Sequence, residues 1–562
     1  MLRPVLDGLG DIAWDQLEHR DGTAEEIPHL LRARRYSTKP DWLLTELLTR
    51  RDGAYSAATA ALPFLVELAS SEDVPWRSVL LSSVGFLARD GADDPDWRTA
   101  WGRVRLDVLA LVEDEDPSVR RYAWRAFSDG RGSADGVLEV MRRCWSDVPS
   151  RLDIVVAARE FAADSEIAAW LRELPLDDDP QMRLAVAYAL GLGVEEFLPG
   201  MSGDMSPWWE TASFRFSPSH VIGLMAEVFA ERPAEHTALL RELSALPNRR
   251  YAVAHNAGTL LSRWRSPEAE SLAIAASWLA DPDPHVRFEA VYLLGCARAE
   301  EHAHAIAALL DDEETWFPPH TEPVGLAAAW ALARCGRQVP DLVRRLAPLR
   351  STRPEPAYRT HVPSLSETLG SLDERAFPEV AELVALLDTE HRSVALWTLG
   401  RLGTPVPELA PADPLAAWAW WRCGGDAAEA AGVIATDVTA AGALRRRSVQ
   451  LLGHMGPEAA HLADRLPLGD EGIAMRVDTR YAHLRMTGEP GDLVPVCLEA
   501  LNGLGSGRFE PVMIRAAEAL EEAGARLEVA ATVLASDRRL CCHGGWRGFD
   551  QDERMRAALR EL

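Results

Sequence analysis

The chain has 562 residues, of which 47% are hydrophobic, and its formal net charge at pH 7 is −27. This apolar content is enough for a continuous core and excludes a largely disordered chain. A negative charge of this size repels phosphate backbones, so we do not expect free nucleic acid as a partner, whereas a basic protein or peptide would be attracted.

Residues 1–70 are expected to form N-terminal capping helices. The first ten residues lack the basic-then-apolar layout of a signal peptide, and no stretch of the chain approaches the roughly 18 apolar residues of a membrane span. Seven cysteines, an odd number, are scattered mostly within apolar helical stretches, as free thiols in a reducing compartment would be. These features predict a cytoplasmic protein without a membrane segment.

A short phrase recurs along the chain and sets the expected architecture. Its copies are Asp116-Pro-Ser-Val-Arg120, Asp179-Pro-Gln-Met-Arg183 and, with two residues more, Asp281-Pro-Asp-Pro-His-Val-Arg287. After each arginine the apolar residues follow helical spacing, and two of the copies continue to a glycine, Gly191 and Gly295. The pattern predicts an amphipathic helix that begins at an Asp or Pro cap and ends at a glycine.

This phrase resembles the second helix of HEAT-type repeats, especially the short form in bacterial HEAT-like proteins of the PBS-lyase type. The resemblance implies an all-α, right-handed α-solenoid of stacked helix pairs, about ten to thirteen of them at roughly 40–47 residues each. It also implies that the second helices line the concave side. The arginines Arg120, Arg183 and Arg287 would form a ladder with aspartates in the turns between neighbouring repeats.

The repeats are expected to be interrupted in two places. HEAT-like repeats would occupy residues 71–348, with an aromatic loop inserted at 200–220, and residues 379–530. A proline-rich connection would join the two arrays at 349–378, and residues 531–562 would form a C-terminal cap.

No strong catalytic or cofactor signature is present in the sequence. It has no His-Glu-x-x-His motif, no nucleophile elbow and no phosphate loop, and Lys39 is its only lysine. The adjacent Cys541 and Cys542, followed by His543, lack the spacing of a tetrahedral zinc site. We therefore expect no metal and no cofactor.

The candidate binding residues form a column on the repeated helix. Count the residue before each arginine as position zero. The residue at position six then lies about 130° around the helix from the buried stripe, so it should face solvent. In successive repeats this position is often aromatic, and two further tryptophans lie in the 200–220 loop. The predicted binding residues are Tyr188, His255, Tyr292, Trp330, Trp397, Trp418 and Tyr481, with Trp208 and Trp209 from the loop.

An exposed aromatic column would mark a binding surface, because Trp and Tyr bury a large area at low entropic cost. The alternative is that superhelical curvature or the aromatic loop buries the column as core. The leading functional hypothesis is a non-enzymatic scaffold that binds a basic protein or peptide in its groove, neutralisation of a basic toxin being one version. The alternatives are a HEAT-like DNA glycosylase, with Arg445–Arg447 near the groove, and an enzyme that uses the groove as a small-molecule pocket. The oligomeric state stays open.

Overall fold

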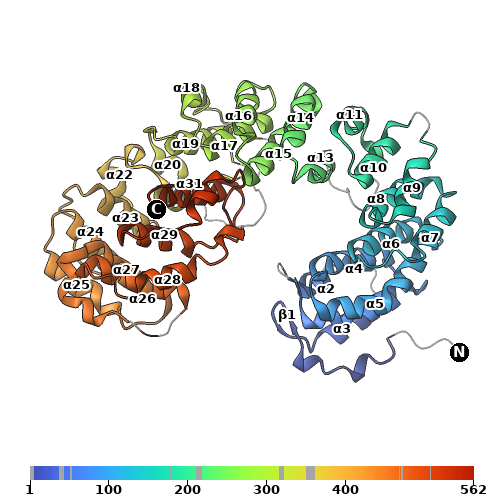
Figure 1. Cartoon of the computed structure of the whole chain (residues 1–562), viewed down its shortest axis with the longest axis horizontal. Helices are drawn as coiled ribbons and strands as arrows, with labels where there is room; N and C mark the ends of the chain where they lie inside the picture. Colours follow the sequence, from blue (N-terminus) through green and yellow to red (C-terminus); the bar gives the residue numbers. More distant parts are fainter. Residues whose placement is uncertain are drawn as a thin grey trace. The chain divides into compact units, whose positions relative to one another are not determined.

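The computed structural model describes the chain apart from residues 1–5, 37–42, 51–52, 177–178, 210–217, 316–321, 350–360, 468, 470–471 and 507. The predicted fold class is confirmed: the described residues form an all-α solenoid of packed helix pairs, with two short strand pairs near the N-terminus (Figure 1). The chain divides into two compact units, Met1–Glu231 and Arg232–Leu562, which we call unit 1 and unit 2.

Unit 1 contains both strand pairs, β1 with β2 and β3 with β4, each antiparallel. Its elements are β1 Glu18–His19, β2 Gly22–Thr23, α1 Ile27–Arg34, α2 Leu43–Leu48, β3 Thr49–Arg50, β4 Gly53–Ala54, α3 Ser56–Ala69, α4 Arg77–Gly91, α5 Pro95–Ala110, α6 Pro117–Asp129, α7 Val137–Cys144, α8 Arg151–Ala158, α9 Ser165–Glu173, α10 Pro180–Leu190, α11 Val194–Ser202, α12 Ser206–Trp209 and α13 Pro218–Ala226.

The regular secondary structure in the described residues of unit 2 is helical, apart from one isolated β-bridge. Its helices are α14 Pro233–Ser244, α15 Arg250–Arg263, α16 Glu268–Ser277, α17 Pro284–Cys296, α18 Ala303–Ala307, α19 Val324–Arg334, α20 Leu342–Leu346, α21 Leu365–Ser371, α22 Val380–Val384, α23 Arg392–Leu402, α24 Pro414–Arg422, α25 Ala427–Ile434, α26 Gly442–Met455, α27 Ile473–Thr487, α28 Leu493–Ala500, α29 Val512–Glu522, α30 Ala530–Ala535 and α31 Gly545–Arg560. Short 3-10 helices, such as Gly456–Arg465 after α26, link several of them.

The Asp-Pro phrases begin helices as predicted. Asp116 caps α6 by accepting a hydrogen bond from the Ser118 amide, and Asp283 caps α17 in the same way. The proline that follows each aspartate lies in the first turn, where its missing N–H costs nothing. Gly191 ends α10 with a φ of 63°, a left-handed conformation that favours glycine. The repeated phrase therefore marks the start of a helix, because its aspartate and proline suit the N-terminal positions.

The arginine ladder is present at most of the expected positions. Arg287 donates to the carbonyl oxygens of Asp281 and Pro282 and pairs with Asp312 at 2.9 Å. Arg120 repeats this geometry, with donations to the residues five and six positions before it and an ion pair to a later turn. The inter-repeat pairs are Arg77–Asp114 at 2.6 Å, Arg120–Asp147 at 3.0 Å, Arg287–Asp312 at 2.9 Å and Arg392–Asp413 at 2.6 Å.

Arg183 is a correction to the predicted ladder. Its side chain is exposed, and it forms no ion pair with any described residue, although Asp179 caps α10 as expected. The phrase alone therefore does not place the arginine in the ladder. An acceptor in the next turn is also required.

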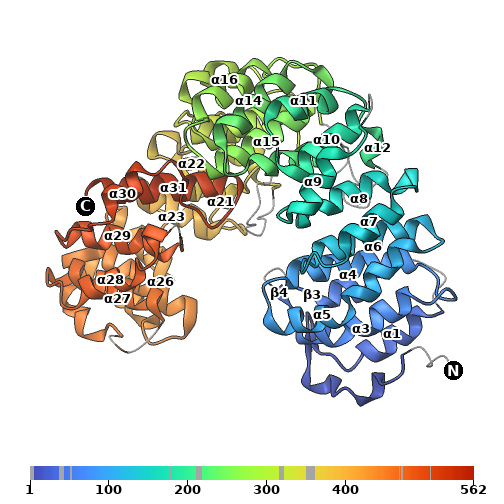
Figure 2. The same ribbon diagram turned by 45° about the vertical axis from the view of Figure 1, so that its right-hand side comes forward.

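The C-terminal segment of unit 2 folds back onto the beginning of the same unit. Helix α31 contacts α29 and α30, which precede it in the chain, and also α15 and α17 near the start of the unit (Figures 1 and 2). An isolated β-bridge between Trp264 and Arg538 and a backbone hydrogen bond from the Arg539 amide to the Arg263 carbonyl lie at this junction. Residues 531–562 thus connect the two ends of unit 2.

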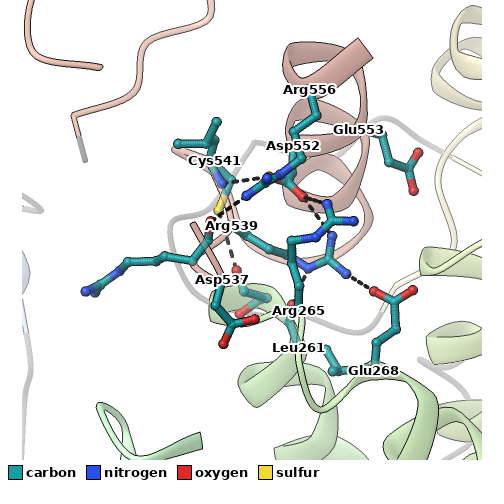
Figure 3. Close-up of polar contacts among 12 residues, drawn as sticks. Leu261, Arg265, Glu268, Asp537, Arg539, Cys541, Asp552, Glu553 and Arg556 are labelled. Carbon is teal, nitrogen blue, oxygen red and sulfur yellow. Dashed lines mark hydrogen bonds and ion pairs between the residues drawn. The ribbon is translucent and has the colours of Figure 1, made fainter. Parts of the chain in front are cut away.

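A buried polar cluster, which we call the clasp, holds this junction together (Figure 3). The carboxylate of Asp552, fully buried, accepts from Arg265 at 2.9 Å, Arg539 at 3.0 Å, Arg556 at 2.9 Å and the Leu540 amide at 3.0 Å. Arg539 and Arg556 are themselves nearly fully buried. A buried carboxylate with this many charged donors is well compensated, but each arginine depends on it.

Cys541 and Cys542 are part of the same junction. The Cys541 thiol lies 3.6 Å from the Ser262 carbonyl oxygen, and the Cys542 thiol lies 3.7 Å from the side-chain oxygen of Gln551. All seven cysteines are free. Within the described ranges, no group of three or more His, Cys, Asp or Glu side chains is arranged to hold a metal ion. None of the described helices is long and apolar enough to cross a lipid bilayer.

The proline-rich connection predicted at 349–378 contains regular structure. Residues 350–360 lie outside the described part of the chain, but α21 follows them, and Ser364 and Glu367 form a reciprocal capping box at its start. Of the aromatic loop predicted at 200–220, Phe214 and Phe216 lie outside the described residues, as does Lys39.

Candidate functional site

Most of the predicted aromatic column is part of the core. The rings of Tyr292 and Trp330 are fully buried and stacked on each other, with centroids 5.0 Å apart. Helix α31 covers Tyr292: the Trp546 amide donates to the Tyr292 hydroxyl at 3.3 Å. The expectation that Trp330 is accessible is therefore wrong, because the C-terminal segment occupies that part of the concave face.

The other members of the column and the loop have packing partners of their own. Tyr188 is 9% exposed beneath the Arg159 guanidinium, Tyr481 is 3% exposed between Arg485 and Arg515, and Trp208 is fully buried. The Trp208 indole donates to Gln181 at 2.6 Å. His255 is half-buried beside Glu289. The side chain of Trp209 lies outside the described residues.

Trp397 differs from the fully packed tryptophans of the column because its ring is only half-buried. It lies on α23 and stacks on Trp418 of α24 at a centroid distance of 4.7 Å, and Trp418 itself is only 3% exposed. A side chain at Gly400 would collide with Trp418, so the glycine keeps room for this stack. The pair thus holds one face of Trp397 rigidly and leaves part of the ring accessible.

Trp397 lies at a hollow of about 460 Å³ inside unit 2, which we call the Trp397 hollow. Helices α23, α26, α27, α29 and α31 contribute its walls. On α26 the lining residues are spaced by four, so they share one face of the helix. The lining residues are Trp397, Arg446, Gln450, His454, Asp478, Pro511, Ile514, Arg515, Glu518, Trp546, Arg547, Asp550, Gln551 and Arg554.

A second hollow, of about 350 Å³, adjoins the first and shares Trp397, Gln450 and His454 with it. Its remaining lining is more apolar, with Val394, Leu415 and Leu451 beside Arg447 and Ser393. A ligand at Trp397 can therefore reach a polar chamber and an apolar one from the same position.

Asp478 forms the polar base of the Trp397 hollow. Its side chain is fully buried, and its Oδ2 accepts from the Arg446 Nε and from the Gln450 amide at 3.0 Å. Its Oδ1 lies 3.5 Å from the Arg515 Nε without forming a hydrogen bond. Two arginines thus share one carboxylate, which fixes their positions.

Cationic side chains outnumber carboxylates around Trp397. Glu518 is also shared, by Arg515 at 3.4 Å and Arg554 at 3.8 Å. Arg447 has no carboxylate partner among the described residues. Burial, together with the charges of Arg515, Arg485 and Arg422, lowers the pKa of His454 to about 4, so this histidine is neutral at pH 7.

Two of the charges that α31 brings to the hollow are already compensated on its other side. Arg547 pairs with Glu367, and Asp550 pairs with Arg334 at 3.2 Å and with Arg298 at 3.5 Å. Arg554 of α31 instead shares Glu518 with Arg515, so the uncompensated charge comes from α26, α29 and Arg554. Both central carboxylates are bound by arginines, which suits them for orienting those arginines rather than for acid–base catalysis. The arrangement is that of a binding site.

The column led to part of this site and missed the rest. Trp397 on α23 belongs to the predicted column, and Arg446 and Arg447 on α26 belong to the run Arg445–Arg447. Asp478 and Arg515 were not predicted, since charged residues on α27 and α29 are typical of a solvated helix face. Trp546 was placed in the cap, and only the return of α31 brings it to the hollow.

The comparisons with known proteins concern the fold. No protein-family model matches the chain, and no curated protein matches it in sequence. Among solved structures it is similar to importin beta, at 14% identity and a TM-score of 0.27, over 90% of this chain and 63% of that one. Kap121p matches at 12% identity and 0.26, over 85% and 52%, and yeast importin-beta (Kap95p) at 13% and 0.25, over 92% and 70%. The chain spans only part of these proteins, and TM-scores this low carry no information about its function.

Proposed function

We propose that the chain is a non-enzymatic protein-binding solenoid, and that the Trp397 hollow receives a short segment of its partner. The observation that carries the proposal is Trp397, a half-buried tryptophan held by a buried one at the edge of a hollow of about 460 Å³. Tryptophans in such settings are the residues that most often dominate interface energies.

The charge of the whole chain supports a partner with a basic surface. A net charge of −27 attracts cations over distances longer than any single contact and speeds their encounter. A basic toxin held in an inactive complex is one partner of this class. Nucleic acid is not the partner that this charge favours, despite the arginines Arg446 and Arg447 near the hollow.

The proposal is tested by affinity capture with the full chain and its Trp397→Ala variant, followed by mass spectrometry. We expect a partner that the intact chain retains and that the variant binds with about 2 kcal/mol less free energy, roughly thirtyfold weaker. Trp421→Ala is the matched control, because Trp421 is also half-buried, lies on α24 and donates to Glu458 away from the hollow.

Circular dichroism of both variants would show that they are folded. Equal retention of all partners by the intact chain and by Trp397→Ala would contradict the proposal. The isoelectric points of the proteins that depend on Trp397 decide whether the partner is basic.

A further inference from the structure

We propose that the Trp397 hollow recognises an acidic residue adjacent to an aromatic one in an extended peptide segment of the partner. The inference rests on the proposed function and names the chemistry that the hollow selects. It follows from the charges and the free hydrogen-bond donors around Trp397.

The first step is the local charge. Arg446, Arg447, Arg515 and Arg554 surround Trp397, and the carboxylates that face them are Asp478 and Glu518. The neighbouring charges of Arg547 and Asp550 are already neutralised by ion pairs with Glu367 and Arg334. The hollow is therefore cationic within a strongly anionic protein. A lysine or arginine of the partner would be repelled here, whereas a carboxylate would neutralise the excess positive charge.

Arg446 supplies free hydrogen-bond donors to the hollow. Arg446 uses its Nε for Asp478, and its Nη1 and Nη2 form no hydrogen bond with any described residue, while 43% of the side chain is exposed. Because Asp478 is buried and also bound by Gln450, it fixes the guanidinium in place before a ligand arrives. A planar, prepositioned guanidinium is the group that binds carboxylates through two parallel hydrogen bonds.

The second hollow offers a place for an aromatic side chain of the ligand. Trp397 shares both hollows, and the second is lined by Val394, Leu415 and Leu451. An aromatic side chain of the ligand can pack there against Trp397, while the adjacent carboxylate reaches Arg446 or Arg447. Neutral His454, between the two hollows, adds no charge that would oppose either group.

The acidic surface and the cationic hollow act over different distances. At physiological ionic strength the Debye length is about 8 Å, so the basic surface of an approaching partner responds, within roughly that distance, to the summed charge of the many exposed groups it faces. An inserted side chain responds to the few groups around it. A partner with a basic surface and one acidic–aromatic anchor satisfies both.

The test is a selection from a randomised nine-residue peptide library displayed on phage, with the full chain as bait and Trp397→Ala as counter-selection. We expect the retained peptides to be enriched in Asp or Glu beside Phe, Tyr or Trp. A selected peptide should lose at least tenfold in affinity when its acidic residue is changed to the amide, measured by fluorescence polarisation.

The same loss should follow in the protein from Arg446→Gln or Arg447→Gln. Arg447 is the safer variant, because it holds no carboxylate within the described part of the chain. The two losses, in peptide and protein, should not add, since each removes the same ion pair. Arg344→Gln, a 77% exposed arginine in the same unit, should leave the affinity unchanged.

Each outcome separates this inference from the proposed function. Peptides that depend on Trp397 but carry basic residues, or no charge preference, would overturn the inference and leave the proposed function intact. Failure to select any peptide that depends on Trp397 would overturn both. Displacement of a selected peptide by single-stranded oligonucleotide at equal concentration would assign the hollow to nucleic acid instead.

Discussion

Arg287 and Arg183 occupy the same position of the repeated phrase, and only their surroundings distinguish them. Arg287 pairs with Asp312 and Glu314 and donates to two carbonyl oxygens, and it is 9% exposed. Arg183 is exposed and has no ion pair among the described residues. Arg287→Ala should lower the free energy of unfolding by about 3 kcal/mol, because it leaves the half-buried Asp312 carboxylate and two carbonyls without their donor.

Arg183→Ala is the matched substitution and should change the unfolding free energy by no more than about 0.5 kcal/mol. Urea unfolding of both variants, followed by circular dichroism, gives the comparison. Equal effects of the two substitutions would show that the ladder contacts of Arg287 contribute nothing beyond the helix itself.

His454 and His236 should make unit 2 sensitive to mild acid. Burial lowers the pKa of each to about 4, with Arg515 adding to the effect at His454 and Arg263 at His236. In the unfolded chain each histidine binds a proton below the ordinary histidine pKa of about 6.5. In the folded chain it stays unprotonated until about pH 4. The stabilisation is therefore present above pH 6.5 and is lost as the pH falls to 4, by on the order of 3 kcal/mol per histidine.

The measurement is the unfolding free energy of the intact chain and of His236→Leu between pH 7 and pH 4. Neither ring nitrogen of His236 has a hydrogen-bond partner among the described residues, so leucine removes the titration without breaking a hydrogen bond seen there. The variant should lose less stability over this interval than the intact chain. His461→Leu, at an exposed position, should follow the intact chain. Parallel curves for all three proteins would exclude a contribution from His236.

At the scale of the helices, the sequence predicts what neighbouring residues determine. The helix starts at Asp116 and Asp283 follow from local capping chemistry, and the pairing of Arg287 with the next turn follows from the resemblance of the phrase to HEAT-type repeats. The capping box of Ser364 and Glu367 carries the same kind of signal, although it lies within a segment predicted as a connection. Local chemistry was sufficient to identify the repeats and their class.

The burial of the aromatic column depends on contacts that no local pattern contains. Helical spacing places Tyr292 and Trp330 on the face turned away from the repeat interface, and that much of the prediction is geometrical. What covers this face is α31, more than two hundred residues later in the chain. Of the predicted binding residues whose burial the structure describes, Trp397 and His255 stay partly accessible, and Trp397 lies at the hollow whose wall α31 helps to form.

At the scale of unit 2, the clasp changes how a repeat protein unfolds. In an open solenoid each repeat contacts only its neighbours, so the ends fray independently. Here Arg265 and Asp552, separated by 287 positions in the chain, form an ion pair inside the core. The first helices of the unit cannot open without exposing the last helix, and we infer that the two ends unfold together.

Asp552→Asn tests this coupling with almost no change in shape. The amide removes the charge that holds Arg265, Arg539 and Arg556, so unit 2 should lose about 3–5 kcal/mol of stability, the usual effect of breaking a buried ion pair. In native-state hydrogen exchange of the intact chain, the amides of α15 and α31 should open with the same free energy. In the variant, α31 should open first, while α15 stays protected by α14, α16 and α17. Glu561→Gln, an exposed carboxylate at the end of α31, should preserve the common opening. If α15 and α31 still open together in Asp552→Asn, the hydrophobic contacts of α31, and not the clasp, couple the two ends of the unit.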